Sequence, residues 1–398
     1  MRIRVLGGAM KTLIKNARVV TKENIIENGY CIVENGLISS LGSGHVSLLE
    51  DYKEIDANGN YLIPGFVDLH CHGGNGYDFM DGTIKSNEEI SSFHLLHGTT
   101  TLFLTTLCAD KITTKKAFET CKEFLKKSQK TNVAGVHLEG PCLNPVQCGA
   151  QKVADMVHPL EFNLEELVAE YPFIKRISIA PELDGANDLA RKGKTLGLVL
   201  SIAHTDGDFN DVKNAIDNGY TLATHLYSGM NGVTRKNAFR KAGVVEGALY
   251  FDDMYVELIA DGRHLPKELL QYVYKIKGAD KICLVTDATR PAGLPNGAKS
   301  VIGSLDNGQE IIVENDVAFL PDKQSFAGST ATFNRLYRTM AGAIGKNMVA
   351  LSKMCSTTPA KVMGYTDRGE IAQGKLADLI IMDDDLNIKQ IIFKGECL

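Results

Sequence analysis

Tyr61-Leu-Ile-Pro-Gly-Phe-Val-Asp-Leu-His-Cys-His72 is an apolar run that ends in two histidines separated by one residue. Side chains alternate between the two faces of an extended strand, so His70 and His72 lie on the same side of it. Two imidazoles in that position can bind one metal ion. By itself the pair is a weak signal, because most His-x-His pairs are unrelated surface or core residues. The rest of the chain must therefore supply the other ligands.

The middle of the chain, about residues 63–366, repeats the pattern of this run. Apolar strand-like runs alternate there with longer amphipathic stretches, which is typical of βα units around a parallel sheet. Eight such runs indicate a (β/α)8 barrel of the TIM type, an α/β fold. Helical patterns between them cover 111–127, 164–170, 209–218 and 266–277. The eight predicted strands are 63–72, 99–106, 133–139, 174–182, 196–204, 221–225, 255–261 and 281–287.

Both ends of the chain have a different texture from the middle. Residues 12–62 are typical of short strands, and the Asn-Gly pairs at 28–29 and 35–36 predict hairpin turns. The last thirty or so residues again contain two β-rich runs. Because the termini of a domain often lie close together, we expect residues 1–62 plus 367–398 to form one small β-sandwich domain. The barrel would then occupy 63–366.

Metal-capable side chains stand at the carboxyl ends of five of the eight predicted strands. In a barrel of this type those ends meet on one face, where active sites are built. A lone His after a strand is usually structural, and an Asp followed by Ala-Thr has the alternative role of a helix cap. Chance placement does not give this regularity, so we favour a shared site. Its members are His70, His72, Glu139, His204, His225 and Asp287, with His264 just beyond the seventh strand.

The other five histidines provide a comparison. His45 lies in a Gly/Ser loop, His94 and His97 lie on a predicted helix, and His158 precedes a proline. We assign these four to the surface or to packing. His137 lies two residues before the glutamate that ends its strand and faces the same way, deeper in the barrel. We predict that it is a hydrogen-bonded core histidine.

Composition limits the classes of function. The chain has 398 residues, 44% of them hydrophobic, and its net charge of −5 excludes the basic surplus that nucleic-acid binding needs. The nine cysteines are scattered and contain no C-x-x-C pair, which favours reduced thiols in the cytoplasm. No apolar run approaches a membrane span, and residues 1–10 lack the pattern of a secretory leader. We expect a cytoplasmic enzyme without nucleic-acid or membrane partners, beginning at Met1 or Met10.

The ordered motifs of the chain resemble those of the amidohydrolase superfamily, and within it the N-acetylglucosamine-6-phosphate deacetylase family. The resemblance covers nearly the whole chain, including the C-terminal Gly369-x-Ile-x-x-Gly-Lys-x-Ala-Asp-Leu. The motifs are P-G-F-V-D-x-H-x-H-G at 64–73, H-L-E-G-P at 137–141, A-H-T at 203–205, T-H-L-Y at 224–227, D-G-x-H at 261–264, T-D-A at 286–288, G-L-P-N-G at 293–297 and A-G-S-T at 327–330.

The resemblance implies two divalent metal ions per chain. Glu139, His204 and His225 would hold the first, which these deacetylases always have. His70 and His72, with Glu139 as the bridge and Asp287 as a further ligand, would hold the second, which some relatives lack. Many superfamily members bridge with a carboxylated lysine after the fourth strand, but 178–182 reads Ser-Ile-Ala-Pro-Glu. Zinc suits imidazole and carboxylate ligands, with iron, manganese and cobalt as alternatives.

The resemblance also implies a mechanism. A metal activates a water molecule and polarises the amide carbonyl. Asp287 would accept a proton from that water as general base and return it to the leaving amine as general acid.

Substrate contacts follow the family less closely. The loop after H-L-E-G-P ends in Gln151 where the family has a histidine, and an amide donates hydrogen bonds but carries no proton. Ser228 and Gly229 replace an Asn-Ala pair that contacts the sugar phosphate, and His264 matches another substrate-contacting position.

A phosphate-binding arginine is supplied across a homodimer in the family. Arg240 is the best match, with Arg235 as the alternative, in a cationic stretch that also includes Lys236 and Lys241. Such a stretch is commonly only a solvated loop. Beside a barrel mouth in an acidic protein, it favours an anionic ligand.

Three functions remain open from the sequence. The first is deacetylation of an amino-sugar phosphate, N-acetylglucosamine-6-phosphate above all, by a homodimer. The second is hydrolysis of another N-acyl compound, for instance N-acetylgalactosamine-6-phosphate. The third is a non-catalytic scaffold, which ranks last because no metal ligand is missing.

Overall fold

The computed structural model describes residues 11–46, 52–128 and 130–398. Eight parallel strands form its central sheet, in the order β17-β16-β13-β12-β11-β10-β9-β6. The first and last strands meet through a bridge between Cys71 and Ala288, which closes the barrel. The strands are β6 (Phe66–Cys71), β9 (Thr99–Thr105), β10 (Val133–Glu139), β11 (Ile174–Ile179), β12 (Val199–Ile202), β13 (Leu222–Ala223), β16 (Tyr255–Leu258) and β17 (Ile282–Leu284). The predicted (β/α)8 fold is confirmed.

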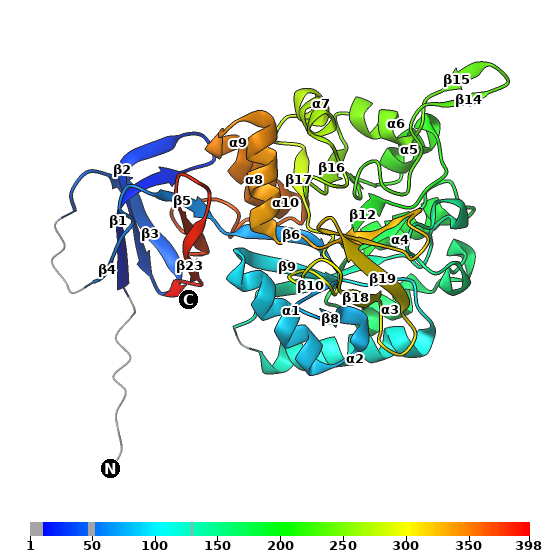
Figure 1. The fold of residues 1–398 in the computed structure, drawn as a ribbon, viewed down its shortest axis with the longest axis horizontal. Coiled ribbons are helices and arrows are strands. Elements are labelled where there is room, and N and C mark those ends of the chain that lie inside the picture. The colour runs from blue at the N-terminus through cyan, green and yellow to red at the C-terminus, as the bar shows by residue number, and fades with distance from the viewer. Residues whose placement is uncertain (1–10, 47–51, 129) are drawn as a thin grey trace, which may run out of the picture.

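Helices surround this barrel (Figure 1). The longest shows why the sequence folds there: the Asp110 side chain accepts from the backbone N–H groups of Ile112 and Thr113, and Lys126 and Lys127 occupy the last turn. None of the helices in the described ranges has the length and apolar character needed to cross a bilayer. The helices are α1 (Ile84–Leu96), α2 (Lys111–Lys127), α3 (Leu164–Glu170), α4 (Ala186–Thr195), α5 (Phe209–Asp217), α6 (Val244–Tyr250), α7 (Lys267–Lys277), α8 (Phe333–Ile344), α9 (Met348–Ser352) and α10 (Thr358–Val362).

Strands from both chain ends share a second sheet, which lies beside the barrel (Figure 1). Its order is β24-β23-β22-β5-β1-β2-β3, with β4 paired to β1, so the expected small β domain is confirmed as one mixed sheet. The strands are β1 (Lys11–Val20), β2 (Ile25–Glu34), β3 (Leu37–Ser43), β4 (Lys53–Asp56), β5 (Tyr61–Pro64), β22 (Leu379–Met382), β23 (Ile388–Phe393) and β24 (Glu396–Cys397).

The opening run of the sequence is divided between the two sheets. Ile63 and Pro64 pair with Ile380 and Leu379 in the small sheet, so the first barrel strand begins at Phe66 rather than at residue 63. The exact domain boundaries stay a prediction. Expectations about a leader peptide or a start at Met10 fall on residues 1–10, outside the described ranges.

One of the two predicted hairpin turns is wrong. The pair at 35–36 does form the turn between β2 and β3, and both residues have positive φ. The pair at 28–29 instead lies inside β2, where Gly29 is opposite Ala17 at an irregularity in the pairing with β1. Asn and Gly tolerate positive φ, so they suit a bulge as well as a turn.

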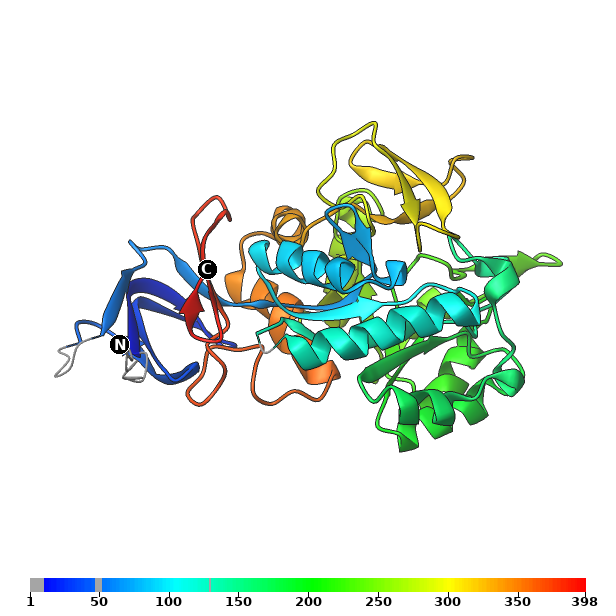
Figure 2. The same ribbon diagram turned by 90° about the horizontal axis from the view of Figure 1, so that it is seen from below.

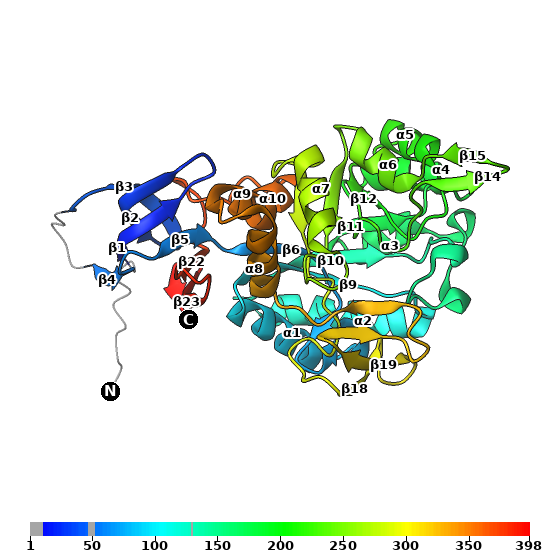
Figure 3. The ribbon, with the colours of Figure 1, turned by 45° about the horizontal axis from the view of Figure 1, so that its top comes forward.

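Helices α8 to α10 lie between the small sheet and the barrel (Figure 3). The rings of Phe66, at the start of β6, and Phe333, in α8, stack with centroids 4.8 Å apart. This packing fixes the first barrel strand at the junction of the two sheets.

Three short sheets were not predicted, and one of them is the pair of β7 (Gly73–Gly74) with β8 (Tyr77–Asp78). A four-stranded antiparallel sheet, formed by the part of the sequence between β17 and α8, stands over the barrel (Figure 2). A hairpin projects from the opposite end of the barrel from the small sheet (Figure 1). Their strands are β18 (Lys299–Ile302), β19 (Gln309–Glu314), β20 (Val317–Phe319) and β21 (Phe326–Ser329), and β14 (Thr234–Lys236) and β15 (Phe239–Lys241).

Candidate active site

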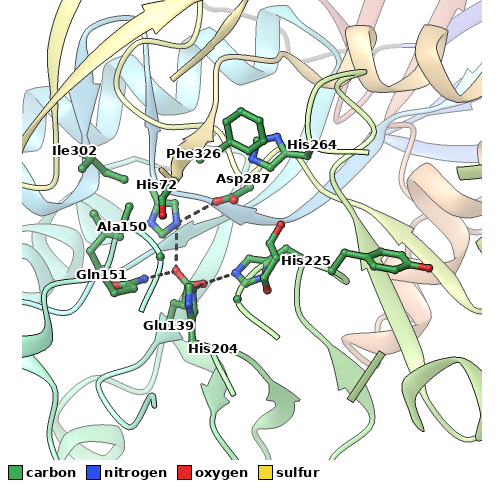
Figure 4. Close-up of a pocket in the computed structure, with 17 residues that line it drawn as sticks. His72, Glu139, Ala150, Gln151, His204, His225, His264, Asp287, Ile302 and Phe326 are labelled. Carbon is green, nitrogen blue, oxygen red and sulfur yellow. Dashed lines mark hydrogen bonds and ion pairs between the residues drawn. The ribbon is translucent and has the colours of Figure 1, made fainter. Parts of the chain in front are cut away.

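Glu139, the last residue of β10, lies at the centre of the predicted cluster (Figure 4). Its Oε1 is 2.9 Å from Nε2 of His225 and 3.3 Å from Nε2 of His204. Its Oε2 is 3.3 Å from Nε2 of His72 and 3.5 Å from Nε2 of His70. Each oxygen thus faces one pair of imidazoles, which is the arrangement of a carboxylate that bridges two cations.

Asp287 completes the side of the cluster formed by β6. Its Oδ1 lies 3.2 Å from Nε2 of His72 and 3.4 Å from Nε2 of His70. The backbone N–H of Asp287 donates to the carbonyl of His70 at 2.9 Å, so barrel closure itself brings the residue to these imidazoles. All six predicted ligands are therefore brought together.

Three of these residues have unusual backbone conformations. His204, His225 and Asp287 have φ of 44°, 29° and 45°. Non-glycine residues rarely adopt positive φ, and such strain persists where the surrounding structure imposes it, commonly at functional sites. The sharp turn after each strand directs the side chain across the barrel mouth.

The second ring nitrogen of each histidine shows how the rings are oriented. When Nδ1 carries the proton and donates it to an acceptor, the lone pair of Nε2 is free for a metal. Three of the four rings have a backbone carbonyl at Nδ1, and the fourth, His70, has the Glu257 carboxylate at 3.5 Å. The carbonyls are those of Thr105 for His72 (3.2 Å), Gln147 for His204 (2.8 Å) and Ser228 for His225 (3.1 Å).

The charges of the cluster also fit a cation. Burial acts to lower the pKa of His70 and His72, but the carboxylates of Glu139 and Asp287 outweigh it and raise the values to about 10 and about 9. Burial acts to raise the pKa of Glu139 and Asp287, but the imidazoles outweigh it, so that Glu139 lies well below its usual range and Asp287 at about 2. The paired carboxylates therefore stay ionised and attract positive charge.

The donor atoms are spaced for metal binding. Two groups of three residues each have donor atoms within 4.8 Å of one another. One group is His70, His72 and Asp287, and the other is His70, Glu139 and His225. Mixed imidazole and carboxylate donors suit zinc and other first-row divalent ions. The residues present thus fit a metal centre, with all its ligands buried.

A cavity of about 290 Å³ opens over this cluster (Figure 4). Five of the six predicted ligands line it; His70 is fully buried beneath. Four of the five predicted substrate-binding residues also line it, namely Gln151, Ser228, Gly229 and His264. A small molecule in this cavity can therefore contact both the metal ligands and these polar groups.

A model of the amidohydrolase family matches residues 61–398. The chain belongs to this family. The N-acetylglucosamine-6-phosphate deacetylase of Bacillus subtilis (strain 168) is 31% identical to this chain over 396 residues. The alignment covers 97% of this chain and 97% of that relative. The N-acetylgalactosamine-6-phosphate deacetylase of Escherichia coli O157:H7 is 26% identical, covering 97% of this chain and 99% of the relative.

A solved structure gives the same picture. A mutant N-acetyl-D-glucosamine-6-phosphate deacetylase from Mycobacterium smegmatis, in complex with N-acetyl-D-glucosamine-6-phosphate, superimposes with a TM-score of 0.88 at 25% identity. The match covers 98% of this chain and 99% of that structure. The resemblance noted in the sequence is confirmed, and this amidohydrolase belongs to a metal-dependent group of enzymes.

Gln151 is held by two hydrogen bonds in this amidohydrolase. Its Nε2 donates to Oε2 of Glu139 at 2.8 Å, and its Oε1 accepts from the backbone N–H of Cys108 at 2.7 Å. The side chain is buried at the cavity wall. Gln151 therefore contacts the Glu139 carboxylate directly, which sequence reasoning did not anticipate.

His264 is oriented by a neighbouring carboxylate. Its Nδ1 lies 2.9 Å from Oδ2 of Asp261, and its ring lies 4.6 Å from the ring of Phe326 (Figure 4). Phe326 and Ile302 come from the four-stranded sheet over the barrel, which supplies one wall of the cavity. These two residues were missed, although the A-G-S-T motif at 327–330 directly follows Phe326 in β21.

Arg240 does not line the cavity of its own chain. It lies on the exposed hairpin, opposite Arg235 in the pairing of β14 with β15, and its Nη1 donates to the carbonyl of Ala238 at 2.9 Å. Lys241, beside it, pairs with Asp208 at 2.5 Å. The hairpin carries its arginines away from the barrel (Figure 1).

Two of the remaining histidines, His137 and His94, have structural contacts in the core. His137 is fully buried, and its Nε2 lies 2.7 Å from the hydroxyl of Ser178, as expected of a hydrogen-bonded core residue. His94 is fully buried too, and its Nε2 donates to the carbonyl of Gly73 at 2.9 Å. Burial lowers the pKa of His94 to about 4, so it packs as a neutral ring.

Two buried charged residues below the cluster were also missed. Arg176, on β11, forms an ion pair with Glu257, on β16, and both side chains are completely buried. Burial acts to raise the pKa of Glu257, but Arg176 and His70 outweigh it and lower it to about 2. The sequence signal was present as charged residues inside apolar strand runs, at 174–179 and 255–258.

Proposed function

We propose that this amidohydrolase is a metal-dependent deacetylase that converts N-acetylglucosamine-6-phosphate to glucosamine-6-phosphate and acetate. The observation that carries the proposal is the Glu139 carboxylate between two pairs of imidazoles, with Asp287 beside it, at a cavity of a chain that aligns over nearly its full length with deacetylases. A non-catalytic scaffold is disfavoured because every ligand position is filled by a donor.

Two divalent ions per chain are part of this proposal. His204, His225 and Oε1 of Glu139 would hold one ion, and His70, His72, Oε2 of Glu139 and Asp287 would hold the other; zinc is the metal that we favour. When bound, such ions lower the pKa of water and polarise a carbonyl oxygen.

Asp287 would move the proton. Its low pKa leaves it ionised near neutral pH, so Oδ1 can accept a proton from the attacking water. Returning that proton to the amide nitrogen lets the amine leave as the carbon–nitrogen bond breaks. The second N–H of the Gln151 amide, whose first N–H donates to Glu139, and Nε2 of His264 would orient the acetamido and sugar groups in the cavity.

A homodimer would supply the cation that a phosphate requires. Among the described residues that line the cavity there is no lysine or arginine, although a phosphate is best bound by a bidentate guanidinium. The projecting hairpin carries Arg235 and Arg240 into solvent, where a second copy of the chain can receive them. We assign Arg240 to the phosphate of the partner's site.

Replacing Arg240 with Ala tests this assignment. We expect KM for the phosphorylated sugar to rise about 10- to 100-fold with little change in kcat, because a charge-assisted hydrogen bond of about 1.5–3 kcal/mol is lost. Arg235→Ala is the matched control on the opposite strand of the hairpin. An effect in Arg235→Ala alone would reassign the contact, and no effect in either would remove the hairpin from the site.

Hydrolysis of N-acetylgalactosamine-6-phosphate is the alternative. The full-length likeness to a deacetylase of that name, together with Gln151 and Ser228 at the cavity, supports it. Acetate release should therefore be measured side by side from the two phosphorylated sugars and from their unphosphorylated forms. The proposal expects the highest kcat/KM on N-acetylglucosamine-6-phosphate, and preference for an unphosphorylated sugar would contradict it.

Metal binding should depend on pH. The pKa values of His70 and His72 are raised from 6.5 to about 10 and about 9. Protonation of these rings therefore stabilises the metal-free fold fully below about pH 6.5, and this contribution is lost as the pH rises through about 9 to 10. Metal competes with these protons, so we expect affinity to increase with pH over that window and about two protons to be released per chain near neutral pH. Zinc titration of metal-free protein with a pH indicator measures both; a pH-independent affinity would contradict the expectation.

We also place the enzyme in the cytoplasm. All nine cysteines are free thiols, and most are buried, which suits a reducing compartment.

A further inference from the structure

His70 differs from the other three histidines of the cluster in what faces its Nδ1. The other three rings use backbone carbonyls, which no side-chain substitution removes. Nδ1 of His70 is fully buried and makes no close hydrogen bond; the acceptor beside it is Oε2 of Glu257, at 3.5 Å. The orientation and proton position of this one ring therefore depend on a side chain.

Glu257 connects both halves of the cluster. The same Oε2 accepts a hydrogen bond of 3.2 Å from the backbone N–H of His225, at the start of the left-handed turn that directs the His225 ring. Its Oε1 is paired with Nη1 of Arg176. The carboxylate of Glu257 thus contacts one histidine from each half of the cluster, His70 and His225.

Arg176, which pairs with Glu257, is itself held by several hydrogen bonds. Its guanidinium is completely buried, and every nitrogen of it has a partner inside the barrel. A buried ion pair of this kind gives little stability, since an apolar pair of equal volume is commonly as stable or more stable. The partners other than Glu257 are the Ser201 hydroxyl (3.1 Å), the Thr224 hydroxyl (2.9 Å) and the Leu69 carbonyl (3.2 Å).

We propose that Glu257 is a positioning residue for the ion held by His70 and His72, and that Arg176 holds Glu257 in place. Glu257 keeps the proton of the neutral His70 ring on Nδ1, so that the lone pair of Nε2 faces the cluster. Carboxylate partners of this type raise the basicity of the ring, and their loss commonly costs about 10- to 100-fold in metal affinity. The inference rests on the proposed metal-dependent function but concerns metal binding alone.

The test is zinc titration of metal-free wild-type and variant proteins against a chelating indicator, with bound metal counted per chain. In Glu257→Gln, Arg176 takes the single amide oxygen, so the NH2 group faces Nδ1 of His70 and favours the wrong tautomer. We expect the affinity of one site to fall about 10- to 100-fold while the site of His204 and His225 keeps its zinc. Asp378→Asn, which neutralises a buried carboxylate immediately before β22 of the small sheet, should change the zinc affinity of neither site.

A double variant covers the case in which Glu257→Gln leaves Arg176 uncompensated and unfolds. Arg176→Met with Glu257→Leu replaces the pair by apolar side chains of similar length and should fold. We expect it too to lose zinc from one site. A variant that binds two ions with wild-type affinity, or a wild type that binds only one, overturns the inference. Absence of acetate release from wild type with two ions would instead count against the proposed function.

Discussion

Asp287→Asn is expected to lower kcat for acetate release by about 100- to 10,000-fold, the usual contribution of a general acid–base, with little change in KM. Asn keeps the size of the side chain and one oxygen toward His70 and His72, but it cannot accept a proton from water. The pKa of Asp287, at about 2, means that the wild-type residue is in the accepting form at neutral pH. Steady-state kinetics with a coupled acetate assay measures the split between kcat and KM.

Metal content decides how this result is to be read. Oδ1 of Asp287 lies 3.2 Å from Nε2 of His72, among the predicted metal ligands. The variant must therefore be shown to keep its metal before a loss of turnover is assigned to proton transfer. A variant with full metal and near wild-type kcat would falsify the role of Asp287. Loss of metal together with turnover would make Asp287 a ligand first.

Glu139→Gln is expected to have the broadest effect, because both metal positions use this carboxylate. Each oxygen of Glu139 faces two imidazoles, and an amide offers one neutral acceptor in place of two charged ones. Loss of an outer partner alone costs about 10- to 100-fold in affinity, so we expect losses on the order of 100-fold or more at both sites, with activity falling in parallel. Metal analysis after dialysis measures the effect.

Asp378→Asn is the matched control for this variant. Asp378 is also buried, but it lies immediately before β22 of the small sheet, where it accepts from the backbone N–H of Lys394 at 2.8 Å. It should keep wild-type metal content. If Glu139→Gln also retains both ions, Glu139 is not the bridge, and the two-metal site has to be revised.

Much of the fold could be predicted because local patterns and long-range contacts agree. Each barrel strand lies within one of the eight strand-like runs of the sequence, and α2 and α3 follow the expected ranges. The division of the opening run at Gly65 could not be predicted, because β5 and β6 have the same apolar character and only their partners differ. The bulge at Gly29 was hidden for a similar reason: turns and bulges select the same residues.

The predicted ligands could be found because each one lies at or within three residues of the end of a strand, and strand ends meet in a barrel. Contacts between a predicted metal-binding residue and a side chain elsewhere in the barrel leave no comparable pattern in the sequence. Gln151 bonds to Glu139 through a loop whose path depends on tertiary packing. Glu257 and Arg176 come from non-adjacent strands, and only closure of the barrel shows that their charges meet.

The most direct measurement is acetate release from N-acetylglucosamine-6-phosphate by zinc-loaded protein, compared with the same protein after chelation and after zinc is restored. We expect hydrolysis that is lost on chelation and returns with zinc. No acetate from fully loaded protein, or hydrolysis that persists without metal, would contradict the assignment of a metal-dependent deacetylase.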